Sequence, residues 1–195
     1  SLLAALPARE HAAGLAEVIN YGVIVYFAFF DRSEAHVPAL LERSNDALQQ
    51  VLLRSCASKA KVVFEDERES GIRALLNFGH TFGHAIEKLA GYGQWLHGEA
   101  VAIGMVMAAE LSVAHTGFPP ADARRLRQLL ENLGLPVSLG RHDFDLEAMI
   151  EAMGMDKKVS DGRLKFVLAR SLGDVVISDD VGLDRLRDLL CEQLA

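Results

Sequence analysis

Five polar residues between positions 73 and 87 have the side chains and the spacing of a binding site on a helix. They recur at steps of four, three, four and three and are Arg73, Asn77, His80, His84 and Glu87. At about 100° per residue they lie within an arc of roughly 80°, and apolar residues cover the rest of the cylinder. Solvated helix faces usually carry Lys and Glu, whereas a guanidinium, an amide and two imidazoles suit an anion or a metal. The pattern predicts one helix over residues 73–87 with a polar site along it; the alternative is a hydrogen-bonded polar seam in the core.

The two histidines of this stripe indicate a metal ion. His80 and His84 lie one helical turn apart, a spacing at which two imidazoles can share an ion. Thr81 occupies the position at which zinc proteases of the His-Glu-x-x-His type carry their general base, so that class is excluded. The pair alone is not specific, because a single histidine on such a helix is more often a hydrogen-bonded core residue.

Two further residues elsewhere in the chain can complete a metal site. His97 stands at the start of a strongly apolar helical segment, where the helix dipole disfavours a charged imidazole and leaves a neutral ring able to bind metal. Glu17 lies among apolar residues, and a buried carboxylate must be paired, protonated or bound to a metal. Two histidines and one glutamate form a catalytic zinc site with an open coordination position. Residue types alone leave Glu10 and Glu99 as alternatives to Glu17.

Lysines supply the candidate anion-binding groups. Lys157 and Lys158 precede a predicted turn, and Lys59 lies late in a predicted helix. Their ammonium groups can bind a phosphate or carboxylate, although adjacent lysines in a loop are usually solvated surface residues.

The hydrophobic pattern that positions these side chains is mainly helical. It predicts a mainly α, multi-helix bundle-like domain over residues 1–195, with one small β-hairpin near the C-terminus. The predicted helices cover residues 8–30 with a break at Tyr21-Gly22, 44 or 45 to 67, 73–87, 98–114, 121–133, 145–153 and 183–194. The predicted strands, 164–169 and 174–178, flank Leu172-Gly173.

Composition narrows the class of protein. The chain has 195 residues, 50% of them hydrophobic, and a net charge of −7, which disfavours nucleic acid and anionic membranes as partners. The apolar segment 100–109 is too short to span a bilayer. Cys56 and Cys191 form no Cys-x-x-Cys pair, which fits a reducing cytoplasm, and both are predicted to be buried thiols. The chain contains no Gly-x-Gly-x-x-Gly or Walker-type phosphate loop.

Four segments together resemble the 3-dehydroquinate synthase family. They are Gly14-Leu-Ala-Glu17-Val-Ile, the stretch Arg73 to Glu87, Trp95-Leu-His97-Gly-Glu-Ala100, and Asp156-Lys-Lys-Val-Ser-Asp-Gly162. The resemblance covers about residues 6–177 and implies that family's C-terminal helical domain. It also implies that the family's NAD-binding half would precede Ser1. A non-catalytic metabolite-binding or assembly module, or another sugar-phosphate cyclase, is the alternative.

The resemblance implies an activity and its cofactors. The family converts a seven-carbon 2-keto sugar acid phosphate, 3-deoxy-D-arabino-heptulosonate 7-phosphate, to 3-dehydroquinate with loss of phosphate, using NAD and a divalent metal, zinc or cobalt. This is a step of the shikimate pathway of aromatic amino acid biosynthesis, and the family implies a cytoplasmic homodimer.

The resemblance also assigns roles to individual residues. The metal ligands would be Glu17, His80 and His97. His84, Glu69 and Lys59 would take part in catalysis, and the substrate would be bound by Arg73, Asn77, Lys157, Lys158 and Asn20.

Asn20 departs from the family pattern. The family usually reads Glu-Val-Ile-Lys where this chain has Glu17-Val-Ile-Asn20. A neutral amide therefore replaces a cation expected in the substrate pocket, either as a tolerated variant or as a sign of a changed substrate.

Overall fold

A computed structural model describes residues 5–65, 71–91, 93–140, 144–154 and 164–194. Within these ranges the fold is mainly α-helical with one antiparallel hairpin, as the sequence predicts. The elements in chain order are α1 (Ala8–Ile24), α2 (Phe27–Ala35), α3 (Val37–Leu41), α4 (Asn45–Glu65), the 3₁₀ helix η2 (Ile72–Asn77), α5 (His80–Ala90), α6 (His97–His115), α7 (Pro120–Asn132), α8 (Leu146–Gly154), β1 (Phe166–Ser171), β2 (Asp174–Ser178) and α9 (Leu183–Leu194).

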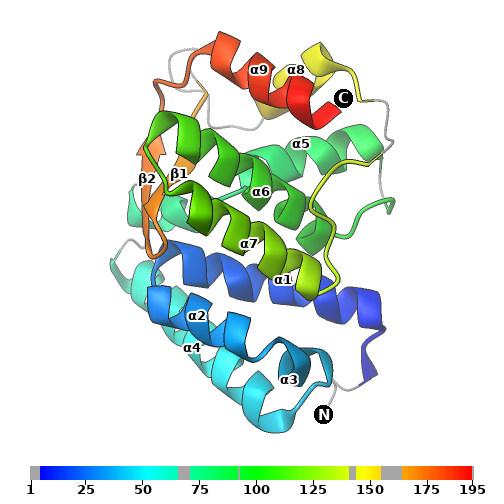
Figure 1. Ribbon diagram of the computed structural model, residues 1–195, viewed down its shortest axis with the longest axis vertical. Helices are drawn as coiled ribbons and strands as arrows, with labels where there is room; N and C mark the ends of the chain where they lie inside the picture. Colours follow the sequence, from blue (N-terminus) through cyan, green and yellow to red (C-terminus); the bar gives the residue numbers. More distant parts are fainter. Residues whose placement is uncertain (1–4, 66–70, 92, 141–143, 155–163, 195) are drawn as a thin grey trace.

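Helix α6 is the central element of the fold. It runs between α1 on one side and α5 on the other, with α7 alongside (Figure 1). Every residue from Gly98 to Ala109 is buried, as the apolar composition of this segment predicts. Among the described helices α6 alone is long and apolar enough to cross a membrane. Its composition is accounted for by packing, since 78% of its apolar window is buried inside the fold.

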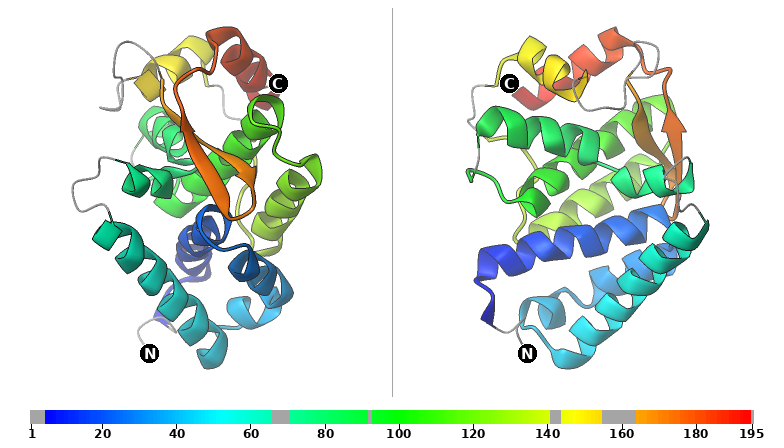
Figure 2. Two further views of the ribbon diagram at one scale, coloured as in Figure 1. Left: turned by 90° about the vertical axis from the view of Figure 1, so that its left-hand side faces the viewer. Right: turned by 180° about the vertical axis from the view of Figure 1, so that it is seen from behind.

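The other elements form layers around α1, α5 and α6. Helices α2, α3 and α4 lie on the far side of α1, and α8 and α9 cover the opposite end of the molecule beyond α5 (Figure 1). The hairpin lies across the ends of α1 and α6 (Figure 2). Its register pairs Phe166 with Ser178 and Ala169 with Val175, and the amide of Gly173 in its turn donates to the carbonyl of Val23 in α1.

The prediction of one helix over residues 73–87 is wrong. The segment is a 3₁₀ helix that ends at Asn77 and an α-helix that begins at His80, separated by Phe78 and Gly79. Gly79 has a φ of +81°, which residues with a Cβ rarely adopt. It also lies against α6, where a Cβ at this position would be 2.6 Å from the amide nitrogen of Met105. Close packing on α6 therefore breaks the helix, and the five polar residues do not form one stripe.

The predicted break at Tyr21-Gly22 is also misplaced. Helix α1 continues to Ile24, and the chain turns at Val25 and Tyr26 before α2. Gly22 instead provides room for α2 to fold back, because a Cβ there would lie 3.0 Å from the Cα of Phe30. The short helix α3 was not predicted. Cys56 and Cys191 are exposed rather than buried, since both lie on outward faces of α4 and α9.

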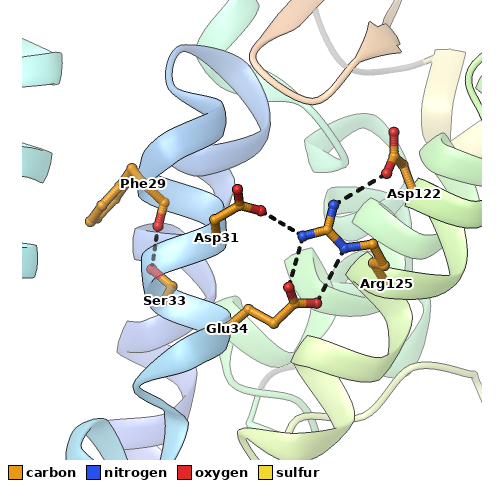
Figure 3. Close-up of polar contacts among 6 residues, drawn as sticks. All are labelled: Phe29, Asp31, Ser33, Glu34, Asp122 and Arg125. Carbon is orange, nitrogen blue, oxygen red and sulfur yellow. Dashed lines mark hydrogen bonds and ion pairs between the residues drawn. The ribbon is translucent and has the colours of Figure 1, made fainter.

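A cluster of charged residues fastens α2 to α7. The guanidinium of Arg125 in α7 lies 2.6 Å from Asp31 and 2.7 Å from Glu34, both in α2. A third carboxylate, that of Asp122, lies 3.4 Å away (Figure 3). The carboxylates of Glu34 and Asp31 raise the pKa of Arg125 above its usual value, although burial opposes them. This ion-pair cluster joins helices on the side of the fold away from α5.

Candidate metal site

Three residues from three helices meet at one point. Glu17 lies in the middle of α1, His80 is the first residue of α5, and His97 is the first residue of α6. The Oε1 atom of Glu17 lies 3.4 Å from the Nε2 atom of His80 and 3.4 Å from the Nε2 atom of His97. The three ligand atoms all lie within 4.8 Å of one another. The structure thus brings together the three residues expected to bind a metal.

Close approach of α1 and α6 places Glu17 opposite His97. Gly98 makes this approach possible, because a Cβ at this position would lie only 1.9 Å from the carbonyl oxygen of Ala13 in α1. The same two helices are joined by an ion pair at their N-terminal ends. Arg9 donates from Nε to Oε1 of Glu99 at 2.6 Å and from its NH2 group to Oε2 at 2.7 Å. This two-point contact fixes both the spacing and the direction of the helices.

Glu99 has a structural role, which removes it as an alternative metal ligand. Besides Arg9, its carboxylate accepts a hydrogen bond from the amide of Leu96 at 2.8 Å, which satisfies one of the unpaired donors at the start of α6. Burial raises the pKa of Glu99, but Arg9 and the Leu96 amide lower it further, so the net shift is downward. Glu10 is exposed at the start of α1.

The arrangement of Glu17 fits a metal better than a hydrogen bond. Its Oε1 atom is buried and has no hydrogen-bond partner, and an unpaired buried carboxylate oxygen is costly. Both imidazole nitrogens lie beyond the usual hydrogen-bond distance of about 2.7–3.2 Å. Two ligand atoms that each lie about 2.0–2.1 Å from a tetrahedral zinc ion are separated by about 3.3–3.4 Å. The 3.4 Å separations of Glu17 from His80 and His97 have this value.

Hydrogen bonds at the other ring nitrogens leave both Nε2 atoms available as ligands. The Nδ1 atom of His80 lies 3.3 Å from the carbonyl oxygen of Phe78, and the Nδ1 atom of His97 lies 3.0 Å from Oε2 of Glu87. In each case an oxygen acceptor faces Nδ1 and favours a proton there, so Nε2 is the nitrogen that a metal ion beside Glu17 would bind.

The charges at the site are strongly coupled. Burial raises the pKa of Glu17, but its interactions with His80 and His97 outweigh burial and lower the pKa to about 2. Glu17 raises the pKa of His97, burial opposes it, and Glu87 adds to the increase, which brings the pKa to about 9. Glu17 and Glu87 thus favour a charged His97, whereas the dipole at the start of α6 favours a neutral one. A metal ion would take the place of the proton at Nε2.

His84 and Glu87 extend the site along α5. The ring of His84 lies 5.6 Å from that of His80 and 5.8 Å from that of His97, measured between ring centres. His84, Glu87 and His97 form a second group with metal-ligand geometry. A pocket of about 350 Å³ opens beside His84 and Glu87 and is bordered by Trp95. The polar face of α5 therefore borders a space large enough for a small ligand.

The structure places the other predicted site residues in different environments. Arg73 and Asn77 lie on η2 and are half-buried, and the amide nitrogen of Asn77 donates to the carbonyl of Ala74. Lys59 is exposed on α4. Glu69, Lys157 and Lys158 lie outside the described residues.

Asn20 is buried, with 2% of its surface exposed. Its Nδ2 atom donates to the carbonyl oxygen of Leu76 in η2 at 3.2 Å, and its Oδ1 atom has no hydrogen-bond partner. Asn20 thus connects α1 to the segment that carries Arg73 and Asn77.

Two contacts at the site were missed by sequence reasoning. One is the ion pair of Arg9 with Glu99, and the other is the hydrogen bond between Glu87 and His97. The partners are 90 and 10 residues apart in the chain, so helical periodicity carries no signal for either. Only the placement of Glu87 on the face of His80 and His84 pointed to the second contact.

Two solved structures share this architecture. A 2-epi-5-epi-valiolone synthase from Streptomyces hygroscopicus subsp. jinggangensis 5008, solved with NAD⁺ and Zn²⁺ bound, matches 98% of this chain and 53% of its own chain, with a TM-score of 0.87 and 29% identity. A 2-deoxy-scyllo-inosose synthase complexed with carbaglucose-6-phosphate, NAD⁺ and Co²⁺ matches 97% of this chain and 54% of its own, with a TM-score of 0.78 and 24% identity. The second likeness shows the fold alone.

The family follows from sequence comparison. The model of the 3-dehydroquinate synthase C-terminal family matches residues 14–159, and the chain belongs to this family. It is 49% identical to the 3-dehydroquinate synthase of Nitrosospira multiformis over 98% of this chain and 52% of the relative. It is 50% identical to that of Bordetella pertussis over 90% of this chain and 48% of the relative. The chain thus spans about half the length of the curated relatives it matches.

Proposed function

We propose that this chain is the metal- and substrate-binding half of a 3-dehydroquinate synthase. Its reaction would be the conversion of 3-deoxy-D-arabino-heptulosonate 7-phosphate to 3-dehydroquinate with loss of phosphate. The observation that carries the proposal is the buried Oε1 atom of Glu17, which has no hydrogen-bond partner and lies 3.4 Å from two imidazole nitrogens. Membership of the family and the Zn²⁺ named for the solved 2-epi-5-epi-valiolone synthase support a divalent metal at this point.

Glu17, His80 and His97 would hold the ion, and two histidines with one carboxylate leave a coordination position for substrate. A divalent metal would bind hydroxyl groups of the substrate and polarise the carbon that NAD oxidises. NAD would be bound mainly by the part of the family's length that this chain does not span.

The remaining predicted residues would bind and position the substrate. The guanidinium of Arg73 and the amide of Asn77 suit its anionic and polar groups, and both lie on η2, which contacts α1. His84 would exchange a proton near the phosphate, as the family resemblance implies, and its ring lies beside those of His80 and His97. Lys59, Glu69, Lys157 and Lys158 are proposed on the family resemblance alone. A cytoplasmic homodimer is also proposed on that basis, and the net charge of −7 argues against nucleic-acid or anionic-membrane partners.

Metal content tests the proposal directly. Zinc-reconstituted protein, after removal of loosely bound ions, is expected to contain one zinc per chain by elemental analysis. The triple variant Glu17→Ala, His80→Ala, His97→Ala is expected to contain none, and stoichiometric zinc in that variant would overturn the assignment. Calorimetry with NAD is expected to find no tight site on this chain, because it has no glycine-rich phosphate-binding turn.

A further inference from the structure

Glu87 has no part in the proposed ligand set or in substrate binding, yet it contacts a metal ligand. Its Oε2 atom lies 3.0 Å from the Nδ1 atom of His97. It stands three residues after His84 on α5, and 32% of its side chain is exposed. The contact therefore joins α5 to the first residue of α6.

The two histidines of the site differ in what holds their rings. The side chain of His80 is 11% exposed, and its Nδ1 atom faces the backbone carbonyl of Phe78. Packing and a main-chain acceptor thus fix that ring. The side chain of His97 is 48% exposed, so packing constrains it less, and its Nδ1 atom faces a side-chain carboxylate instead. The orientation of His97 therefore depends on one side chain, that of Glu87, whereas the orientation of His80 does not depend on a single side chain.

We propose that Glu87 is the positioning residue of His97: it accepts the Nδ1–H proton, fixes the tautomer and turns Nε2 toward Glu17 and His80. The inference rests on the proposed metal site. A carboxylate at the second ring nitrogen also makes the ligating nitrogen more basic, and loss of such a partner typically weakens metal binding 10–100-fold.

A different role for Glu87 has to be distinguished from this one. His84, Glu87 and His97 also have the spacing of a metal-binding group, in which Glu87 would itself be a ligand. The Nδ1 atom of His97 cannot both donate a proton to Glu87 and bind a second ion. The two roles therefore predict different numbers of ions per chain.

The test is the zinc affinity of four forms of the chain, measured by competition with a chromophoric chelator. They are the parent chain, Glu87→Gln, Glu87→Ala and Glu131→Ala, a matched control that removes an exposed carboxylate from α7. The alanine variant is expected to bind one zinc 10–100-fold more weakly. The glutamine variant, whose amide oxygen still accepts a hydrogen bond, is expected to lie between it and the parent. The control is expected to match the parent.

NMR of the zinc-bound chain supplies a readout that a merely structural role would not change. The Nδ1–H proton of His97 is expected to exchange slowly in the parent and the glutamine variant and rapidly in the alanine variant. Folding of each variant is checked by circular dichroism.

Three results would overturn an assignment, and they can be told apart. Unchanged affinity and unchanged proton exchange in folded Glu87→Ala would reject the positioning role alone. Two zinc ions in the parent and one in Glu87→Ala would make Glu87 a ligand instead. No stoichiometric zinc in the parent chain would reject the metal site and this inference with it.

Discussion

Arg125 and Glu17 each lie at the centre of a group of charged or ionisable side chains that joins helices, but the atoms around them are spaced differently. The guanidinium of Arg125 lies 2.6 Å and 2.7 Å from the carboxylates of Asp31 and Glu34 (Figure 3). The Oε1 atom of Glu17 lies 3.4 Å from the imidazole nitrogens of both His80 and His97. The charged groups around Arg125 make direct hydrogen bonds, whereas the two separations from Glu17 match those between ligands of a tetrahedral ion.

The difference in spacing shows why a metal ion would suit one group of ionisable residues and not the other. At Arg125, opposite charges make contact directly, so nothing is gained by adding an ion. At Glu17, helix packing holds the partners apart and leaves a buried oxygen without a hydrogen bond, which a metal would satisfy. The spacing is maintained from outside the site by Gly98 and by the ion pair of Arg9 with Glu99. The Arg125 group thus joins helices by direct contact, whereas the Glu17 group keeps a spacing that suits the proposed metal.

The largest loss of stability and of zinc affinity is expected for Gly98→Ala. This substitution disturbs the group around Glu17 and leaves the group around Arg125 intact. The new Cβ would lie 1.9 Å from the carbonyl oxygen of Ala13, so α1 must move away from α6 and carry Glu17 away from His97. Overpacking of this kind costs about 3 kcal/mol of the free energy of unfolding. Urea unfolding of the metal-free chain measures this loss, and a zinc titration is expected to show affinity at least about tenfold lower.

Gly14→Ala is the matched control, because it places the same methyl group on α1 with no atom within 4 Å. It is expected to stabilise the chain by about 0.5–1 kcal/mol, since alanine is the better helix former. If the two variants had the same stability and the same zinc affinity, the close approach of α1 and α6 would not be what spaces the ligands.

Arg125→Ala is the opposite test, because it disrupts the ion-pair cluster around Arg125 and leaves the group around Glu17 unchanged. It leaves three carboxylates facing one another and removes a guanidinium that lies 5.3 Å from the centre of the Phe30 ring. The expected loss is about 1–2 kcal/mol in the free energy of unfolding, from partly exposed ion pairs and the cation–π contact. High salt is expected to reduce the difference, and zinc affinity is expected to stay unchanged.

The neighbouring substitution Arg124→Ala removes an exposed arginine from the same helix and is expected to change stability by less than about 0.5 kcal/mol. A loss as large as that of Arg125→Ala would mean that net charge, and not the contacts in Figure 3, accounts for the effect.

Asn20→Ala tests a link between α1 and the proposed substrate-binding residues on η2. It removes the hydrogen bond from Nδ2 to the carbonyl of Leu76, at an expected cost of about 1 kcal/mol. The cost stays small because the Oδ1 atom, which has no partner, is removed as well. Thermal unfolding measures the loss, and an unchanged zinc affinity would show that η2 can shift without moving Glu17. A tenfold drop in zinc affinity would place Asn20 within the metal site instead.

The sequence correctly predicted those helices and turns whose ends are determined by their own residues. Helix α9 has the predicted bounds, and the hairpin turns at Leu172-Gly173 as expected. The break at Gly79 was missed because a glycine within a helical pattern is usually tolerated. What breaks the helix is the approach of Met105, 26 positions further along the chain. Local periodicity contains no information about such a contact.

The same limit applies to the candidate site. Periodicity identified His80 as a polar residue on an apolar helix, and the apolar neighbours of Glu17 in the sequence marked it as unusual. Periodicity could not choose Glu17 over Glu10 or Glu99, because the choice depends on how α1 lies against α6. The family resemblance supplied that choice before the structure did. The contacts of Arg9 and Glu87 came only from the structure, since each joins two helices.

The smallest effect concerns a third group, in which a histidine and a carboxylate do make direct contact. The Nε2 atom of His115 lies 3.0 Å from Oδ1 of Asp180, and the hydroxyl of Ser178 donates to the same oxygen. These two hydrogen bonds, from Ser178 first and then from His115, lower the pKa of Asp180 below its usual value. A carboxyl whose pKa is lowered by folding stabilises the protein above the unfolded pKa of about 3.9, and this contribution is lost as the pH falls through the folded value.

Asp180→Asn is therefore expected to lower Tm slightly at pH 7, and the difference should shrink as the pH falls below about 4. Carbon-13 NMR of the Asp180 carboxyl measures the pKa directly. A midpoint at or above about 3.9, the value for an unperturbed Asp, would show that the contact is not maintained in solution. The group would then no longer contrast with Glu17, whose imidazole neighbours lie 3.4 Å away.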